Sequence, residues 1–157
     1  LAESVSARLR EQGMRAKTAH LCVRDTGLYS FVRQTKLDHP TNITSEISRA
    51  CMQLFRENYG WQTPIRSLTV STSDLVGADN PEQLSLFDDQ APRRRVEAAE
   101  GAVDDIRRRF GYRAIGRALF LKDRAIGLMA PKDDHTIHPV GYLQNGTMDS
   151  VIGGRSQ

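Results

Sequence analysis

Hydroxyl-bearing and basic side chains recur along three segments of the chain whose residue alternation is typical of β-strands. Side chains of these types bind phosphate oxygens, and such contacts position a protein on a nucleic acid without reading its sequence. The candidate phosphate-contacting residues are Thr18, His20, Arg24, Arg33, Gln34, Lys36, Arg66, Ser67, Thr69 and Ser71. The alternative interpretation of the same residues is an ordinary solvent-exposed strand face.

A short apolar peptide, Gln83-Leu84-Ser85-Leu86-Phe87, forms a second candidate site. It lies between polar stretches, residues 78–82 and 88–92, each of which contains a proline. Leucine and phenylalanine in a polar linker of this kind are suited to being bound by another protein. The alternative is a buried edge strand or a loop anchor.

Acidic and histidine residues form no catalytic pattern in this sequence. Asp104 and Asp105 fall in the middle of a predicted helix, where neighbouring side chains point to different sides. A second group could bind a metal ion but lies in a weakly patterned tail, where such residues are usually ordinary surface: Asp133, Asp134, His135 and His138. We therefore expect no catalytic or metal-binding residue in this chain.

Composition permits one domain with tails, because 157 residues are enough to bury a substantial core. The net charge is only +3, which allows a localised basic face but does not by itself indicate nucleic-acid binding. Cys22 and Cys51 lack paired or metal-ligand spacing, so reduced core thiols and a cytoplasmic location are expected. No membrane-spanning run or signal-peptide pattern is found, and a first residue of Leu1 suggests a fragment.

The first half of the chain predicts a helix, a β-hairpin and a second helix. Helical spacing of Val5 and Leu9 ends at Gly13, and residues 14–25 then alternate as a strand. On this strand we expect one face to carry Lys17, Ala19, Leu21 and Val23, and the other Thr18, His20, Cys22 and Arg24. Thr26-Gly27 predicts the turn and residues 28–37 a second strand, which His39-Pro40-Thr41-Asn42 should end.

The second helix and the elements after it complete the pattern. The helix should begin at a cap, Asn42 or Thr44, and stop at Gly60. Its apolar stripe consists of Ile43, Ile47, Ala50, Cys51, Leu54 and Phe55. A third strand is predicted over 64–75, and a further helix, closed by Gly111, carries Val96, Ala99, Val103, Ile106 and Phe110. Arg107 to Arg109 at its end are expected to be a solvated cap, and residues 113–121 a short strand.

These elements indicate an α+β fold, an antiparallel sheet with helices packed on one face. The order helix, strand, strand, helix, strand is that of a split βαββαβ unit whose first strand is missing. We expect the domain over 1–77, a linker with the apolar peptide over 78–92, a helix and strand extension over 93–121, and a partly disordered tail over 122–157. The open sheet edge invites pairing between chains, so the oligomeric state stays undetermined.

Three segments of the chain resemble the little-finger domain of bacterial Y-family translesion DNA polymerases, in particular their UmuC-like and DNA polymerase IV-like branches. They are Arg33-Gln34-Thr35-Lys36-Leu37, Ile65-Arg66-Ser67-Leu68-Thr69-Val70-Ser71 after the second helix, and Gln83 to Phe87 after the last strand. A helix ending near Arg-Phe-Gly-Tyr follows this peptide, as in the UmuC-like branch. The resemblance covers about residues 1–121.

This resemblance implies an accessory domain that holds primer-template DNA in a DNA repair and damage-tolerance enzyme. It implies that Gln83 to Phe87 binds the ring-shaped sliding clamp. The parent would be a nucleotidyltransferase whose Mg²⁺ ions are held by carboxylates of a palm domain absent from this sequence, so the fragment alone should be inactive. One departure is that Ser67 and Ser71 occupy positions where family members often carry arginines.

Two other interpretations stay open. A stand-alone clamp-binding module would use the apolar peptide and treat the basic strands as solvent-exposed surface. A small unrelated α+β enzyme would need paired acid-base residues, for which the sequence offers no candidate.

Overall fold

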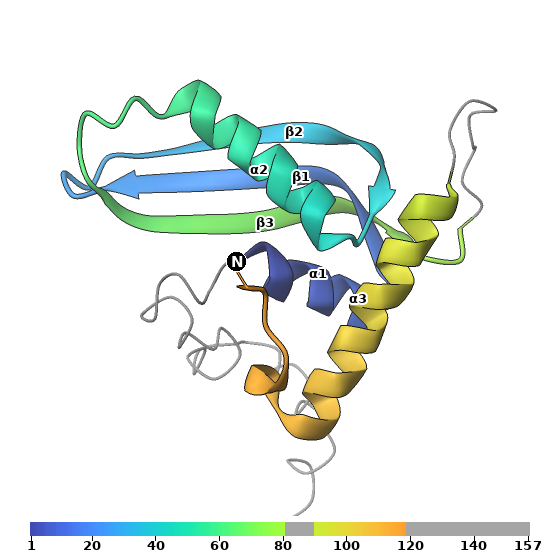
Figure 1. Ribbon diagram of the computed structural model, residues 1–157. Helices are drawn as coiled ribbons and strands as arrows, with labels where there is room; N and C mark the ends of the chain where they lie inside the picture. The colour runs from blue at the N-terminus through green and yellow to red at the C-terminus, as the bar shows by residue number, and fades with distance from the viewer. Residues whose placement is uncertain (81–89, 119–157) are drawn as a thin grey trace, which may run out of the picture. The chain divides into compact units, whose positions relative to one another are not determined.

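The computed structural model describes residues 1–80 and 90–118, and Leu1–Arg117 form one compact unit. The element order is α1 (Ala2–Glu11), β1 (Met14–Asp25), β2 (Ser30–Thr41), α2 (Thr44–Asn58), β3 (Ile65–Gly77) and α3 (Ala91–Phe110), followed by a 3₁₀ turn over Tyr112–Ala114. These elements confirm the predicted α+β class, with the helices packed against an antiparallel sheet (Figure 1).

The sheet has the strand order β2-β1-β3, and both pairs are antiparallel. β1 is the central strand and is paired along nearly its whole length, from Met14 opposite Gly77 to Arg24 opposite Ser67. The predicted hairpin of β1 and β2 is confirmed, with its turn at Thr26 and Gly27. β2 and β3 are the two edge strands of the described sheet.

α1 and α2 lie side by side over one face of the sheet (Figure 1). A first apolar cluster joins Val5 and Leu9 of α1 to Ile47 of α2 over Ala16 and Ala19 of β1. A second cluster, Leu21, Val23 and Leu54, continues towards the hairpin. Burying one large aliphatic side chain stabilises a fold by ~1.5–3 kcal/mol, so these clusters hold α1 and α2 on the sheet.

The strand ends at Thr41, within the stretch His39 to Asn42 that was expected to end it, but the predicted last residue, Leu37, is wrong because β2 continues through Pro40. Proline is tolerated here because β2 is an edge strand. The register with β1 is also irregular at this point, since Thr18 pairs with Lys36 whereas Ala16 pairs with Thr41. The extra β2 residues, Pro40 among them, lie in that irregular stretch.

The same irregularity changes which β1 residues are buried. Ala16 and Ala19 are both fully buried under the helices, whereas Lys17 is exposed. The expectation that Lys17 shares the buried face is therefore wrong, because strict alternation is interrupted between Ala16 and Thr18.

The predicted caps of α2, Asn42 or Thr44, are also wrong. The N-cap residue is Ile43, which provides no side-chain cap, and Thr44 already belongs to the helix. The Thr41 hydroxyl accepts a hydrogen bond from the Ile43 amide at 3.0 Å. The Thr44 amide donates to the carboxylate of Glu100, a residue of α3. The helix ends at Asn58, two residues before Gly60.

Two expectations for the C-terminal part need correction. α3 ends before Gly111 as predicted, but no residue of α3 is buried, and Val96, Ile106 and Phe110 are exposed. The short strand expected from residue 113 does not form over the described residues 113–118, where the chain makes the 3₁₀ turn instead. The remainder of that prediction and the tail from Lys122 onwards lie outside the described residues.

Candidate nucleic-acid interface

The face of the sheet opposite α1 and α2 carries polar side chains in rows across all three strands. The pairing register places Gln34, His20 and Ser71 in one row, and Ser30, Arg24 and Ser67 in another. The two further rows are Lys36, Thr18 and Ser73, and Val32, Cys22 and Thr69. We call these four rows the open face.

Eight of the ten predicted phosphate-contacting residues lie on the open face, and only Arg33 and Arg66 do not. Six of the eight are exposed: Arg24, Gln34, Lys36, Ser67, Thr69 and Ser71. Thr18 is buried and donates a hydrogen bond from its hydroxyl to the Asp74 carboxylate at 2.5 Å. His20 is half-buried, and its Nε2 lies 2.8 Å from the Ser73 hydroxyl.

Arg33 lies on the other side of the sheet. It pairs with Leu21, whose side chain is buried under α2. Its Nε donates to Asn58 Oδ1 of α2 at 2.9 Å, and its guanidinium lies 5.2 Å from the centre of the Phe31 ring. Strand alternation puts Arg33 and its neighbour Gln34 on opposite faces of β2, so the predicted phosphate-contacting residues do not all share one face.

Arg66 is exposed at the start of β3, where the β1–β3 register shifts between Arg24 and Asp25. Asp25 pairs with Ile65 across this shift, so Arg66 belongs to none of the four rows.

A wide groove of about 710 Å³ lies at the end of the sheet marked by Lys36 and Thr18. Its lining brings together basic residues from β1 and β2, namely Arg15, Lys17, Lys36 and His39, with Asp38 and Asp74 among them. Sequence reasoning missed Arg15 and Lys17 as members of this group. The bulge between Ala16 and Thr18 interrupts the alternation at these positions, so alternation alone does not place Arg15 and Lys17 in this group.

The cysteines lie on opposite faces of the sheet. Cys22 is half-exposed on the open face, in the row that it forms with Val32 and Thr69. Cys51 belongs to α2 and is buried between that helix and the sheet, where its Sγ donates to the His20 carbonyl at 3.8 Å. Burial raises the pKa of this thiol. No disulfide is possible between thiols separated by the sheet in this way.

Gln83 to Phe87 lie outside the described residues, but both flanks of this segment are attached to the compact unit. Before it, the Ala78 amide donates to the Gly13 carbonyl at 2.7 Å and the Asn80 amide to the Gly77 carbonyl at 3.1 Å. After it, Arg93 forms a two-pronged ion pair with Glu46 of α2, at 2.8 and 3.1 Å.

The pKa of the Glu46 carboxyl reflects this pair. Burial acts to raise the pKa, but the hydrogen bonds from Arg93 and Thr41, together with the Arg93 charge, hold it below its ordinary value. The carboxylate form is therefore favoured where α3 begins.

Glu100, in the middle of α3, joins three parts of the chain. Its Oε2 accepts hydrogen bonds from Arg10 Nη1 of α1 at 2.6 Å and from the Thr44 amide and hydroxyl of α2 at 2.9 and 2.8 Å. Its other oxygen, Oε1, accepts from Arg117 at 3.3 Å. A carboxylate at a helix N-terminus satisfies a free amide and complements the helix dipole, so Glu100 performs the capping role that no α2 side chain fills.

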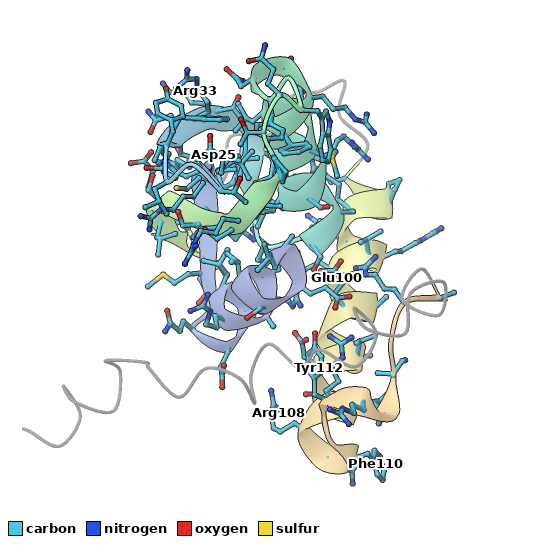
Figure 2. All side chains as sticks on the ribbon, turned by 90° about the vertical axis from the view of Figure 1, so that its left-hand side faces the viewer. Asp25, Arg33, Glu100, Arg108, Phe110 and Tyr112 are labelled. Carbon is cyan, nitrogen blue, oxygen red and sulfur yellow. The ribbon has the colours of Figure 1, made fainter. Side chains whose placement is uncertain are left out.

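The other acidic and basic residues of α3 extend this attachment. Asp104 accepts from Arg10 Nε at 2.6 Å and Glu97 from Arg15 at 3.0 Å, while Asp105 pairs with the exposed Arg108 of its own helix. Arg107 was expected to be solvated, but it reaches Glu3 at 3.5 Å, donates to the Ile115 carbonyl and stacks on Tyr112. Figure 2 shows Glu100 at the junction of α3 with the rest of the unit, and Tyr112 near its lower end.

Within residues 1–80 and 90–118, no group of three or more His, Cys, Asp or Glu side chains is arranged to hold a metal ion. The candidate group Asp133, Asp134, His135 and His138 lies outside these residues. None of the helices in the described part of the chain is long and apolar enough to cross a membrane.

Comparison with known proteins identifies the domain. Residues 1–86 match the family described as "impB/mucB/samB family C-terminal domain". The chain belongs to this family and carries the little-finger domain found in Y-family proteins of the DNA polymerase IV and UmuC type.

The curated relatives are consistent with this assignment. A DNA polymerase IV of Acetivibrio thermocellus is 37% identical over 126 residues, which are 80% of this chain and 32% of the relative. A DNA polymerase IV of Pelotomaculum thermopropionicum is 34% identical over 77% of this chain and 29% of the relative. A putative UV-damage repair protein, UvrX, of Bacillus subtilis is 34% identical over 76% of this chain and 28% of its own length. The chain thus spans about a third of the length of these relatives.

Proposed function

We propose that this chain is the DNA-holding part of an error-prone translesion DNA polymerase and that it tethers the enzyme to the sliding clamp. The observation that carries the proposal is the open face, where three strands align hydroxyl, amide and basic side chains and which α1 and α2 leave uncovered. A flat polar face with separated cations suits contact with successive phosphates of a duplex without base recognition.

Charge limits how tightly this face can hold DNA. Only Arg24 and Lys36 provide formal positive charge within the four rows, and Asp74 lies beside Thr18. Hydroxyl groups would supply the other phosphate contacts, among them those of Ser67 and Ser71, which stand where family members often carry arginines. We therefore expect weak, salt-dependent binding, with the logarithm of affinity falling with a slope of about −2 against the logarithm of salt concentration.

Fluorescence anisotropy of the full chain with labelled primer-template DNA tests this proposal. Arg24→Ala and Lys36→Ala should each weaken binding to all sequences and reduce the salt slope by about 1. Arg49→Ala is the matched control, because Arg49 is equally charged but exposed on α2. Equal effects of all three substitutions would contradict an interface on the open face.

Cysteine alkylation provides an independent test that needs no substitution. Cys22 lies on the open face, whereas Cys51 is buried between α2 and the sheet, so bound DNA should slow the modification of Cys22 and leave the already slow reaction of Cys51 unchanged. An unprotected Cys22 under conditions where DNA is bound would place the DNA elsewhere.

The tether is proposed for Gln83 to Phe87, with Leu84, Leu86 and Phe87 inserted into an apolar pocket of the clamp and Gln83 providing a directed hydrogen bond. Each apolar side chain contributes ~1.5–3 kcal/mol before the entropic costs of binding, which leaves an affinity on the order of micromolar. Joint replacement of Leu86 and Phe87 by alanine should abolish clamp binding and leave DNA binding intact. Retained clamp binding would refute the tether without affecting the DNA-holding role.

Catalysis belongs, in this proposal, to parts of the parent protein outside this chain. There, metal-bound carboxylates of a palm domain would hold Mg²⁺ and drive nucleotidyl transfer. The isolated chain should therefore incorporate no nucleotide in a primer-extension assay. Extension by the purified chain would overturn this division of roles.

A further inference from the structure

An aromatic cluster lies where the hairpin turn meets the loop between α2 and β3. Tyr59 stacks on Phe55 with ring centres 5.2 Å apart, and Trp61 meets both rings edge-on at 5.4 and 5.5 Å. Phe31 of β2 extends the cluster, with its ring 6.5 Å from that of Tyr59. Phe55, Tyr59 and Phe31 are partly buried against the core, so the rings that contact Trp61 are held in place by packing.

Trp61 and two further large side chains at this end, Tyr29 and Leu28, are exposed to solvent. Trp61 is 71% exposed, Tyr29 is 69% exposed and Leu28 is 55% exposed. Large side chains with this exposure stand out on a monomer surface when they occur together. The Tyr29 amide is fixed by the Asp25 carboxylate at 3.0 Å, and the Thr26 amide donates to the Pro64 carbonyl at 3.0 Å, which joins the two loops.

The backbone at this end adopts an uncommon conformation. Leu28 and Trp61 have φ values of 68° and 57°, in the left-handed region that residues with a β-carbon rarely occupy. Such conformations cluster at functional sites, where the surrounding structure maintains them. Here both occur at exposed apolar residues on adjoining loops.

A groove of about 340 Å³ runs between the two loops. Its lining includes Tyr29, Phe31 and Arg33 from the hairpin, and Tyr59, Gly60 and Gln62 from the other loop. Arg33 supplies a cation beside the Phe31 ring, and Asn58 orients the guanidinium. Figure 2 shows Arg33 and Asp25 together at this end of the unit.

We propose that this groove and Trp61 receive an unpaired base of a nucleic-acid strand, a role that rests on the DNA binding proposed above. Aromatic rings beside an arginine form the general recognition surface for unstacked bases, because every base has a π face and a guanidinium can pair with phosphate or stack. The groove is lined by one cation, Arg33, and one carboxylate, Asp25, which accepts a hydrogen bond from the Tyr29 amide. The exposed cations Arg24 and Arg66 lie on the neighbouring strand ends, so positive charge exceeds negative charge around the groove. The hairpin end would thus bind the single-stranded template, and the open face would bind the duplex.

The chain carries its own reporter, because Trp61 is the only tryptophan. The full chain is titrated with three DNAs: a blunt duplex, the same duplex with a single-stranded extension, and a single-stranded oligonucleotide. Tryptophan fluorescence follows stacking, and anisotropy of labelled DNA follows binding. We expect both DNAs that contain single strand to quench Trp61, and the blunt duplex to bind without quenching.

The outcomes separate this inference from the DNA-holding role. Equal quenching by the blunt and extended duplexes, or no quenching while both bind, overturns the stacking site and leaves the open face intact; the groove would then serve a protein segment. Quenching by single strands without any duplex binding supports the stacking site and overturns the duplex role. Absence of binding to all three DNAs overturns both.

Substitutions sharpen the same measurement. Trp61→Ala should weaken binding of the extended duplex about tenfold and leave the blunt duplex unchanged. Met52→Ala is the matched control, because Met52 is a 48% exposed apolar residue on α2 away from the groove. Tyr29→Ala keeps the tryptophan and should reduce its quenching by single strands. An unchanged preference for the extended duplex in both Trp61→Ala and Tyr29→Ala would refute the site.

Discussion

α2 and α3 are attached to the same small domain by opposite kinds of contact. α2 buries Ile47, Cys51 and Leu54 against the sheet, whereas α3 buries no residue and is held by ion pairs. Apolar packing is insensitive to salt and moderate changes of pH, while ionic attachment responds to both. The comparison indicates that α1, α2 and the sheet form the stable part of the domain and that α3 is its adjustable part.

Ile47→Ala should have the largest effect. Ile47 is completely buried between α1, α2 and β1, and truncation of such a residue costs ~2–5 kcal/mol because a cavity remains. Denaturant unfolding of the full chain, followed by far-UV circular dichroism, gives the loss. Met52→Ala on the exposed side of α2 should change the stability by less than ~0.5 kcal/mol. Similar losses in the two variants would contradict a packed α2.

Glu100→Ala should release α3 at a smaller cost. It leaves Arg10, whose side chain is only 12% exposed, with one partner fewer, and it leaves the Thr44 amide uncapped; a charged hydrogen bond of this kind is worth ~1.5–3 kcal/mol. Hydrogen exchange should show faster exchange in α3 and the first turn of α2, with the sheet amides unchanged. Asp105→Ala, which breaks an exposed pair, should leave exchange unaltered.

Added salt should separate the two helices without any substitution. The pairs of Arg93 with Glu46, Arg15 with Glu97 and Arg117 with Glu3 are partly exposed, and each is worth ~0.2–1 kcal/mol. Between low salt and about 1 M salt the Debye length falls to about 3 Å, so exchange of α3 amides should accelerate while that of α2 does not. Equal acceleration in both helices would show that the ionic attachment is not selective.

Loss of the Glu46–Arg93 pair in acid should have the smallest effect, and it should be seen at the first turns of α3. The pKa of Glu46 in the folded chain is lowered from its ordinary value of 4.5, so its stabilising contribution is present above that value and is lost as the pH falls through the lowered pKa. Exchange or limited proteolysis near Arg93 should increase below about pH 4.5. Glu46→Gln should reduce this pH dependence, and an identical acid response in the variant would exclude Glu46 as its source.

The sequence predicted most of what periodicity controls. The bounds of β1, the apolar stripe of α2 and the open-face residues follow from alternation and helical spacing, because burial on one side imposes those periods. Three features were not predicted from the sequence, because they depend on local irregularities of the sheet or on contacts between residues far apart in the chain. Pro40 lies inside β2 because the strand is at an edge, Lys17 is exposed because of a bulge, and α2 is capped by Glu100, which lies 56 residues away from Thr44 in the chain.

The exposed stripe of α3 illustrates a different limit. Val96, Ile106 and Phe110 have the spacing of a core-facing helix, yet they remain exposed. Periodicity shows that apolar residues share a face, but the acidic residues of the adjoining stripe, Glu97, Glu100 and Asp104, decide which side of α3 meets the domain. Their partners Arg10 and Arg15 are distant in sequence, so only the fold reveals the pairing.

The anchored flanks of the apolar peptide have a geometric consequence for the proposed tether. From Asn80 to Gln90 the chain has ten residue steps, a contour of about 35 Å at most. Both ends of this segment are held on the domain, through Ala78 and Arg93. A partner that binds the middle of the segment can therefore lie no more than about 17 Å from Asn80 or Gln90. Release of α3 from the domain would free one end of the segment and increase its reach. The ion pairs of Glu46 and Glu100 would therefore set the maximum distance between the domain and the proposed sliding clamp.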